Sequence, residues 1–131
     1  MEASREDLAT ATDLCILIRR PPYGSICAAE GIRHLIGAIA NGLTVGTVLV
    51  GRGVWVAKAG QDPGETAWTS LCEALSNVLR VAEGPTPQIL VDQDSLIEAG
   101  LKVEDLVSGV RVASPETVAE LVATARHLII F

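Results

Sequence analysis

Short runs of apolar, β-branched residues alternate with helical patterns along the whole chain, and this alternation most constrains the fold. There are five runs, at Leu14–Ile18, Leu43–Val50, Gln88–Val91, Val110–Val112 and His127–Phe131. Continuous apolar runs, rather than strict alternation of apolar and polar residues, are typical of strands covered on both faces, as in a parallel sheet. The pattern therefore predicts a three-layer α/β/α domain with a mainly parallel sheet.

Helical patterns separate these runs, and they are expected over residues 25–41, 62–82, 95–99 and 114–125. Ser25 is the expected N-cap of the first helix, which the Asn41-Gly42 pair ends. Asp62 and Pro63 suit the cap and first position of the second helix, whose apolar positions begin at Trp68. Both helices carry apolar residues at the spacing of a buried stripe.

Length and composition indicate how many domains the chain forms and where the protein is located. The chain has 131 residues, a net charge of −6, 49% hydrophobic and 20% charged residues, which fits one globular domain. We expect residues 1–12 to be an appended tail and residues 13–131 to be the domain. No apolar run is long enough to span a membrane, and the acidic start does not resemble a secretory signal, so a cytoplasmic location is expected.

Direct nucleic-acid binding is not expected, because the sequence pI is near 4.8 and no basic stripe is present. The three cysteines form no CxxC pair, and the two histidines add little to the supply of metal ligands. We therefore expect free thiols in a reducing compartment, with no metal and no cofactor.

Three segments, residues 19–25, 51–55 and 92–95, follow the first three runs. Open parallel sheets bind ligands at the carboxyl ends of their strands, which is where these segments are expected to lie. The first segment, with Arg19 and Arg20, leads into a helix N-terminus and could hold an anion, or it is simply a tight connection. Neither it nor the second segment matches a complete phosphate-binding motif. The aspartates of the third segment could bind a cation or act in acid–base chemistry, or merely cap the short helix. The candidate ligand-binding residues are Arg19, Arg20, Tyr23, Gly24, Ser25, Gly51, Arg52, Gly53, Asp92 and Asp94.

The three cysteines differ in their expected environment. Cys15 lies within the first run and Cys72 on the apolar stripe of the second helix, so both are expected to be buried and inert. Cys27 falls in the first turn of its helix, where the helix dipole lowers the pKa of a thiol, although packing of a small residue is the competing interpretation.

Self-association is a further expectation, because the chain is rich in apolar side chains for its length. Trp55 lies outside any clear core stripe, and it either anchors an interface or caps the core of its own subunit.

The order of four segments resembles the DsrE/DsrF family over residues 13–131. The first is the run ending at Ile18 followed by a Pro-Tyr-Gly-Ser turn and the Ala28–Arg33 helix segment. The others are Val48–Val54, Asp92–Leu101 and the closing Ala125–Phe131 segment. Within the family, the Asp-Ser-Leu-x-x-x-Gly-Leu pattern is most similar to the DsrF/TusC branch.

The resemblance implies an α/β/α fold with a five-stranded parallel sheet and a role in sulfur relay, for tRNA thiolation or sulfur oxidation. It also implies homo-oligomers, or complexes with related DsrE-type subunits. Active members carry a persulfide on a cysteine just after the third strand, eight positions before a glycine. Counting back from Gly100 places that position on Asp92, so the family thiol is absent here.

This departure favours a non-catalytic subunit of a persulfide-transfer complex over a sulfurtransferase enzyme. Asp92 should then lie at the mouth of the sheet beside the N-terminus of the first helix. Two alternatives remain: a sulfur carrier that uses Cys27, and a module that binds a small anionic ligand through residues 19–25.

Overall fold

A computed structural model describes residues 12–66, 70–81 and 87–131. The expected tail falls almost wholly outside this part, as do Trp68 and the expected end of the second helix. Thr12 is described and belongs to the folded domain: it is buried, and its carbonyl accepts a hydrogen bond of 3.0 Å from the Arg126 N–H.

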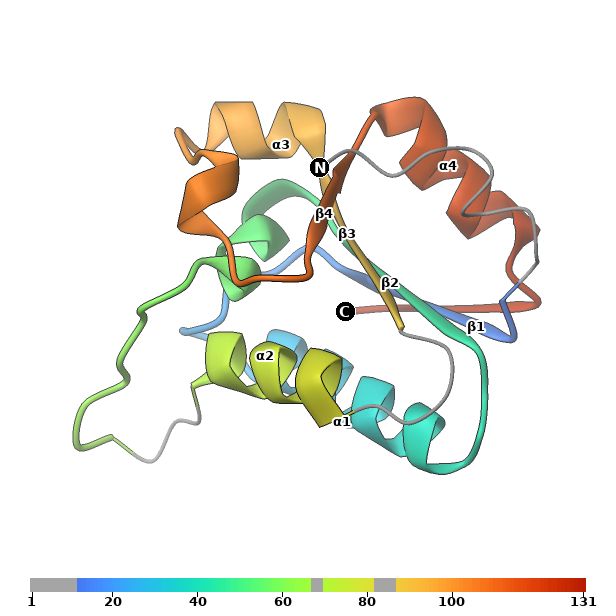
Figure 1. Cartoon of the computed structure of the whole chain (residues 1–131), viewed down its shortest axis with the longest axis horizontal. Coiled ribbons are helices and arrows are strands. Elements are labelled where there is room, and N and C mark those ends of the chain that lie inside the picture. Colours follow the sequence, from blue (N-terminus) through green and yellow to red (C-terminus); the bar gives the residue numbers. More distant parts are fainter. Residues whose placement is uncertain (1–11, 67–69, 82–86) are drawn as a thin grey trace.

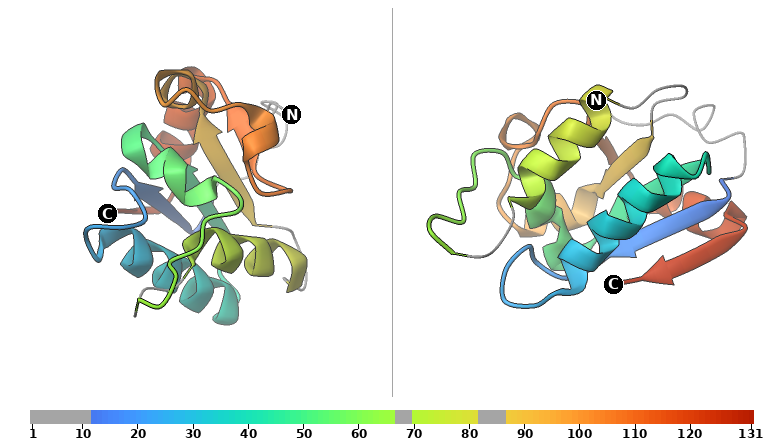
Figure 2. Two further views of the ribbon diagram at one scale, coloured as in Figure 1. Left: turned by 90° about the vertical axis from the view of Figure 1, so that its left-hand side faces the viewer. Right: turned by 90° about the horizontal axis from the view of Figure 1, so that it is seen from below.

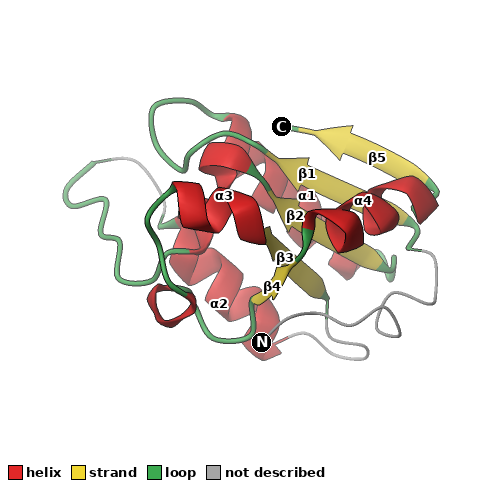
Figure 3. Cartoon of the chain, turned by 90° about the horizontal axis from the view of Figure 1, so that it is seen from above, coloured by secondary structure: helices red, strands yellow, loops and turns green. Residues whose placement is uncertain are grey.

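Five parallel strands form one sheet in the order β4-β3-β2-β1-β5 (Figure 3). Their bounds are Leu14–Ile18 for β1, Val45–Leu49 for β2, Gln88–Asp92 for β3, Arg111–Ala113 for β4 and His127–Ile130 for β5. The register pairs Ile16 with Thr47 and Thr47 with Ile89, so the first three strands are adjacent as predicted. The five-stranded parallel sheet is confirmed.

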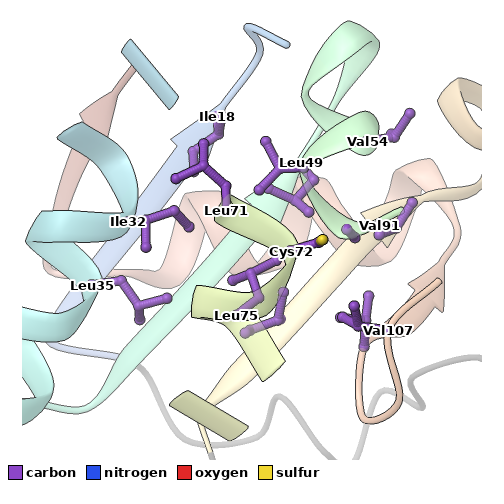
Figure 4. Packing of buried hydrophobic residues seen from close by; sticks show 14 of the residues in the cluster. Ile18, Ile32, Leu35, Leu49, Val54, Leu71, Cys72, Leu75, Val91 and Val107 are labelled. Carbon is purple, nitrogen blue, oxygen red and sulfur yellow. The ribbon is translucent and has the colours of Figure 1, made fainter. Parts of the chain in front are cut away.

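Helices cover both faces of the sheet (Figures 1 and 2). Helices α1 (Cys27–Ala40) and α2 (Leu71–Val81) pack on one face, and α4 (Pro115–Thr124) packs on the other. The larger core lies under α1 and α2, where Leu35, Leu49 and Leu75 are fully buried (Figure 4). The smaller core joins Cys15, Leu90 and Leu121 beneath α4. This is the predicted three-layer arrangement.

The second helix begins later than predicted. Asp62 does not cap a helix; its carboxylate accepts a hydrogen bond of 2.8 Å from the Gly64 N–H and forms a local turn. Gly60 and Gly64 adopt positive φ angles of 78° and 67°, which interrupt a helix, and α2 starts only at Leu71.

The last strand is less covered than its apolar run predicts. Leu128 and Ile130 are 41% and 52% exposed, because β5 is an edge strand and α4 packs mainly on β3 and β4. The interpretation of the final run as a strand covered on both faces is therefore wrong.

Candidate functional site

The carboxyl ends of β1, β2 and β3 bring three segments to one end of the domain (left panel of Figure 2). They are the loop of residues 19–26, the 3-10 helix η2 (Gly51–Ala57) and the short helix α3 (Gln93–Glu98). The predicted site residues of all three segments therefore lie at one end of the sheet, because the strands are parallel and adjacent. The sequence predicts no helix over residues 51–55, whereas the structure makes them the first turns of η2.

Gly53 places η2 directly on the end of β1. A Cβ atom built on Gly53 would lie 2.1 Å from the Ile18 carbonyl oxygen and 3.2 Å from the Arg19 backbone nitrogen. Only glycine permits this approach. Val54 and Val56 are then fully buried, and Arg52 and Trp55 are left at the surface of η2.

The Asp92 carboxylate is part of a hydrogen-bond network. It is the N-cap of α3, and its Oδ2 accepts from the Ser95 N–H at 3.1 Å and from the Ser95 hydroxyl at 2.6 Å. The Ser95 Oγ in turn accepts from the Gly51 N–H at 2.8 Å. The capping interpretation of Asp92 is confirmed, while Asp94 is exposed in the first turn of α3.

Two hollows meet at Arg52 and Trp55. One, of about 290 Å³, is lined by Gly51, Arg52, Trp55, Ser95, Glu98 and Ala99. The other, of about 370 Å³, is lined by Pro21, Pro22, Tyr23, Arg52, Trp55 and Gln61. The Gln61 amide donates to the Trp55 and Lys58 carbonyl oxygens at 2.6 and 2.9 Å, which anchors the chain as it leaves η2.

Trp55 is half-buried and packs against the larger core of its own subunit. The remainder of its side chain lines both hollows. The core contact agrees with one of the two interpretations of Trp55, while its role as an interface anchor stays a prediction.

The loop after β1 contributes two exposed arginines and Tyr23, an aromatic residue that lines the larger hollow. Arg19 and Arg20 are both exposed, and burial raises the pKa of Tyr23, with the nearby Cys72, Asp62 and Glu73 adding to the shift. Gly24 has a positive φ of 96°, which the turn requires.

Helix α1 starts at Cys27 with Ile26 in the N-cap position, so Ser25 is not the N-cap. Its hydroxyl still accepts from the Cys27 N–H, at 3.4 Å.

All three cysteines are free thiols. Cys15 and Cys72 are buried as predicted, and burial raises the pKa of Cys15 to about 11. Cys27 is half-buried in the first turn of α1. All three lie within the described residues, and none of them follows β3.

Histidine and acidic residues form no metal centre in the described part of the chain, where no group of three or more His, Cys, Asp or Glu side chains converges. The Glu30 carboxylate pairs with Arg33 at 2.8 Å, and His34 Nδ1 lies 2.7 Å from the Glu30 backbone oxygen. No described helix is long and apolar enough to cross a membrane.

Ser95 and Gln61 line the hollows but are not among the ligand-binding residues predicted from the sequence. The sequence shows Ser95 only as part of the Asp-Ser-Leu pattern after the third run, and its contact with Gly51 spans 44 positions. Gln61 carries no recognisable signal, because its partners are backbone oxygens of the preceding turn.

Comparison with known proteins agrees with this architecture. An uncharacterized protein of Methanocaldococcus jannaschii is 28% identical over 116 residues, which cover 88% of this chain and 96% of that protein. A TusC homolog of Vibrio parahaemolyticus is 29% identical over 121 residues, 92% of this chain and 99% of its own length. The crystal structure of the YchN protein of E. coli superposes with a TM-score of 0.79 at 20% identity, covering 91% and 98% of the two chains.

The model of the DsrE/DsrF-like family matches residues 12–131, which include every residue that the structure describes. The segments whose order resembles this family in the sequence follow one another in the same order in the structure. They form strands of the sheet and the segments at its carboxyl end. The chain therefore belongs to the DsrE/DsrF-like family.

Proposed function

We propose that this protein is a sulfur-relay subunit without a working thiol, which supports persulfide transfer in a complex with related DsrE-type subunits. Membership of the family and the similarity to a TusC homolog support the sulfur-relay role. The observation that carries the non-catalytic role is Asp92, which occupies the position counted for the family thiol and uses its carboxylate to cap α3.

The environment of the cysteines supports the same role. A persulfide carrier needs an accessible sulfur that is readily ionised, because the thiolate is the nucleophile. Cys15 is buried with a raised pKa, and Cys72 is a buried residue of α2. Neither thiol meets this requirement.

Cys27 is the competing candidate, because it is half-buried and lies in the first turn of α1. In that second function the protein itself carries sulfur. Whether the pathway is tRNA thiolation or sulfur oxidation depends on the partner subunits, and the proposal covers both.

Persulfide mapping separates the two functions. The reduced protein is incubated with inorganic polysulfide, alkylated and digested, and the sulfur load of each cysteine peptide is measured by mass spectrometry. We expect Cys27 to carry no more persulfide than the buried Cys15 and Cys72, whose peptides define the background. A stoichiometric persulfide on Cys27 of the native protein would contradict the proposal and establish a carrier.

Complex formation is tested with the protein isolated from its natural source. Native mass spectrometry is expected to show it bound to at least one further DsrE-type chain that has a cysteine after its third strand. Isolation only as a species made of this chain alone, under the same conditions, would contradict the supporting role.

A further inference from the structure

We propose that the larger hollow at the carboxyl end of the sheet, of about 370 Å³, binds a small heteroaromatic carboxylate. In this site a flat ring lies against Tyr23 and Trp55, and Arg52 binds the carboxylate. The side-chain oxygen of Gln61 accepts a hydrogen bond from a ring N–H. The site does not depend on the sulfur-relay function, because none of the described residues that line it is a cysteine.

Two aromatic rings and two prolines form most of the wall. Pro21, Pro22 and Tyr23 belong to the loop after β1 and Trp55 belongs to η2, so the hollow exists only because these two segments meet. Pro22 is buried, and Tyr23 and Trp55 are half-buried, so the fold holds these side chains in place. Such walls favour a planar ligand, because a ring gains contact on its faces at little cost in side-chain freedom.

The size of the hollow limits the ligand. Small-molecule pockets commonly enclose roughly 300–1,000 Å³, and this hollow lies at the lower end of that range. It therefore suits one ring, or two fused rings, with one short polar group. Apolar and aromatic walls that carry only a few polar groups are also the usual composition of such a pocket.

Arg52 supplies the charge that selects an anion. Among the described residues that line the hollow, it is the one charged side chain. Arg52 is exposed and forms no ion pair with any residue that the structure describes. Its planar guanidinium presents a fork of N–H donors that matches the two oxygens of a carboxylate.

Neighbouring charges determine how the ligand is oriented. Burial raises the pKa of the Tyr23 phenol, and the nearby carboxylates of Asp62 and Glu73 add to the shift. Two negative charges therefore lie near the Tyr23 side of the hollow, whereas Arg52 lines it from η2. A carboxylate on the ligand is repelled by the first pair and attracted by Arg52, which favours a single orientation of the ring.

Gln61 offers an acceptor whose direction is fixed. Its amide nitrogen donates to the Trp55 carbonyl oxygen at 2.6 Å and to the Lys58 carbonyl oxygen at 2.9 Å. Both partners are acceptors, so the NH2 group has to face them and the amide cannot be reversed. Within the described ranges, the Oε1 atom of Gln61 accepts no hydrogen bond. This oxygen is open to a ring N–H, which selects a nitrogen heterocycle over a purely carbocyclic ring.

Titration of the full chain with indole-3-carboxylate, followed by nuclear magnetic resonance, tests the site. We expect saturable shifts of the signals of Tyr23, Arg52, Trp55 and Gln61. Indole-3-carboxamide keeps the shape but not the charge, and it should bind at least about tenfold more weakly. 1-Methylindole-3-carboxylate lacks the ring N–H and should bind about fivefold more weakly. Acetate, which has the charge without the ring, should cause no saturable shift at the same concentrations.

Variants test the charge contact. Arg52→Gln should weaken the binding of indole-3-carboxylate at least about tenfold and leave that of the carboxamide unchanged, because only the charged ligand pairs with the guanidinium. Arg80→Gln is the matched control: Arg80 is exposed in the last turn of α2 and does not line the hollow, so the affinity should not change. Arg20→Gln removes a charge from the loop after β1 that does not line the hollow, and it should weaken binding less than Arg52→Gln does.

The spectrum of each variant shows whether it is folded. The comparison of carboxylate with carboxamide on the native chain tests the charge contact even if Arg52→Gln does not fold.

Absence of saturable binding overturns the proposal, as do shifts that map away from the hollow or equal affinities for the carboxylate and the carboxamide. Equal affinity for the N-methyl analogue overturns the heterocyclic class of ligand. Equal losses in Arg52→Gln and Arg20→Gln would indicate a general positive field and also overturn the site. Each of these results leaves the sulfur-relay function in place. Conversely, a persulfide on Cys27 would overturn that function and leave the ligand site standing.

Discussion

The hydroxyl of Ser95 accepts a hydrogen bond from the Gly51 backbone N–H at 2.8 Å and so joins α3 to the start of η2. The same hydroxyl donates to Asp92 at 2.6 Å, which makes Ser95 the link between the end of β3 and the segment that follows β2. Ser95 therefore helps to fix the positions of α3 and η2 at the carboxyl end of the sheet.

Replacement of Ser95 by alanine should lower the free energy of unfolding by about 1–2 kcal/mol. The variant loses two hydrogen bonds, one of them to a carboxylate. Urea denaturation with an unchanged m-value measures the loss. Ser108→Ala is the control, since Ser108 is exposed and its hydroxyl makes no hydrogen bond within the described residues, and it should change stability little. Equal losses in the two variants would contradict the linking role of Ser95.

Two glycine-to-alanine substitutions should change stability in opposite directions. Gly53→Ala forces a Cβ to within 2.1 Å of the Ile18 carbonyl oxygen, so we expect a loss of about 3 kcal/mol or failure to fold. Gly37 lies inside α1, where an added Cβ would meet nothing within 4 Å, so Gly37→Ala should stabilise by about 0.5–1 kcal/mol. Thermal denaturation of both variants tests the close contact. A Gly53→Ala protein as stable as the native one would rule it out.

The Cys15 thiol should make stability fall at high pH. Burial raises the pKa of Cys15 from 9.0 to about 11 in the folded protein, so between these values the folded state keeps a proton that the unfolded state has lost. The contribution is complete below pH 9 and disappears as the pH rises toward 11, with a slope of up to about 1.4 kcal/mol per pH unit. Cys15→Val should show a shallower alkaline decline in urea midpoints. Identical declines in the two proteins would mean that the thiol ionises normally.

The Asp13 carboxylate should contribute stability that is lost in acid. Hydrogen bonds from the Thr44 N–H and hydroxyl, at 2.9 and 3.0 Å, lower the pKa of Asp13. Because the folded-state pKa lies below the ordinary value of 3.8, the contribution is present above that pH and is lost as the pH falls through the folded value. Asp13→Asn should therefore be less stable than the native protein at neutral pH and more similar to it in acid. A stability difference that does not change with pH would argue against the titration of Asp13.

Asp92→Cys should place an accessible thiol at the mouth of the sheet. We expect an aromatic disulfide reagent to modify the introduced thiol faster than Cys15 or Cys72, with each site identified by peptide mass spectrometry after partial labelling. Asp92→Ser is the control for the lost cap: it keeps a capping hydroxyl, whereas the cysteine variant should lose about 1 kcal/mol of stability. If the new thiol is modified only on unfolding, the position is not open and the assignment of the family thiol to Asp92 is wrong.

The strand runs were predictable because each is a local apolar segment bounded by more polar neighbours. Leu14–Ile18 has the same bounds in the sequence and in the structure, and α4 begins at Pro115, one residue after its predicted start. The start of α2 was not predictable from the same signals. Asp62 and Pro63 fit a helix start, but Gly60 and Gly64 in left-handed conformations convert that signal into a turn.

The candidate site was also predictable in part from the sequence and in part only from the tertiary structure. The sequence by itself determined which segments follow the first three strands, and the parallel sheet then required these segments to meet at one end. Only the tertiary structure decided how they meet: Gly53 lies against Ile18, Ser95 binds Gly51, and Arg52 and Trp55 become the shared wall of two hollows. The reason is physical. Strand and helix formation respond to patterns of nearby residues, whereas a contact over 44 positions depends on the packing of elements that no local pattern encodes.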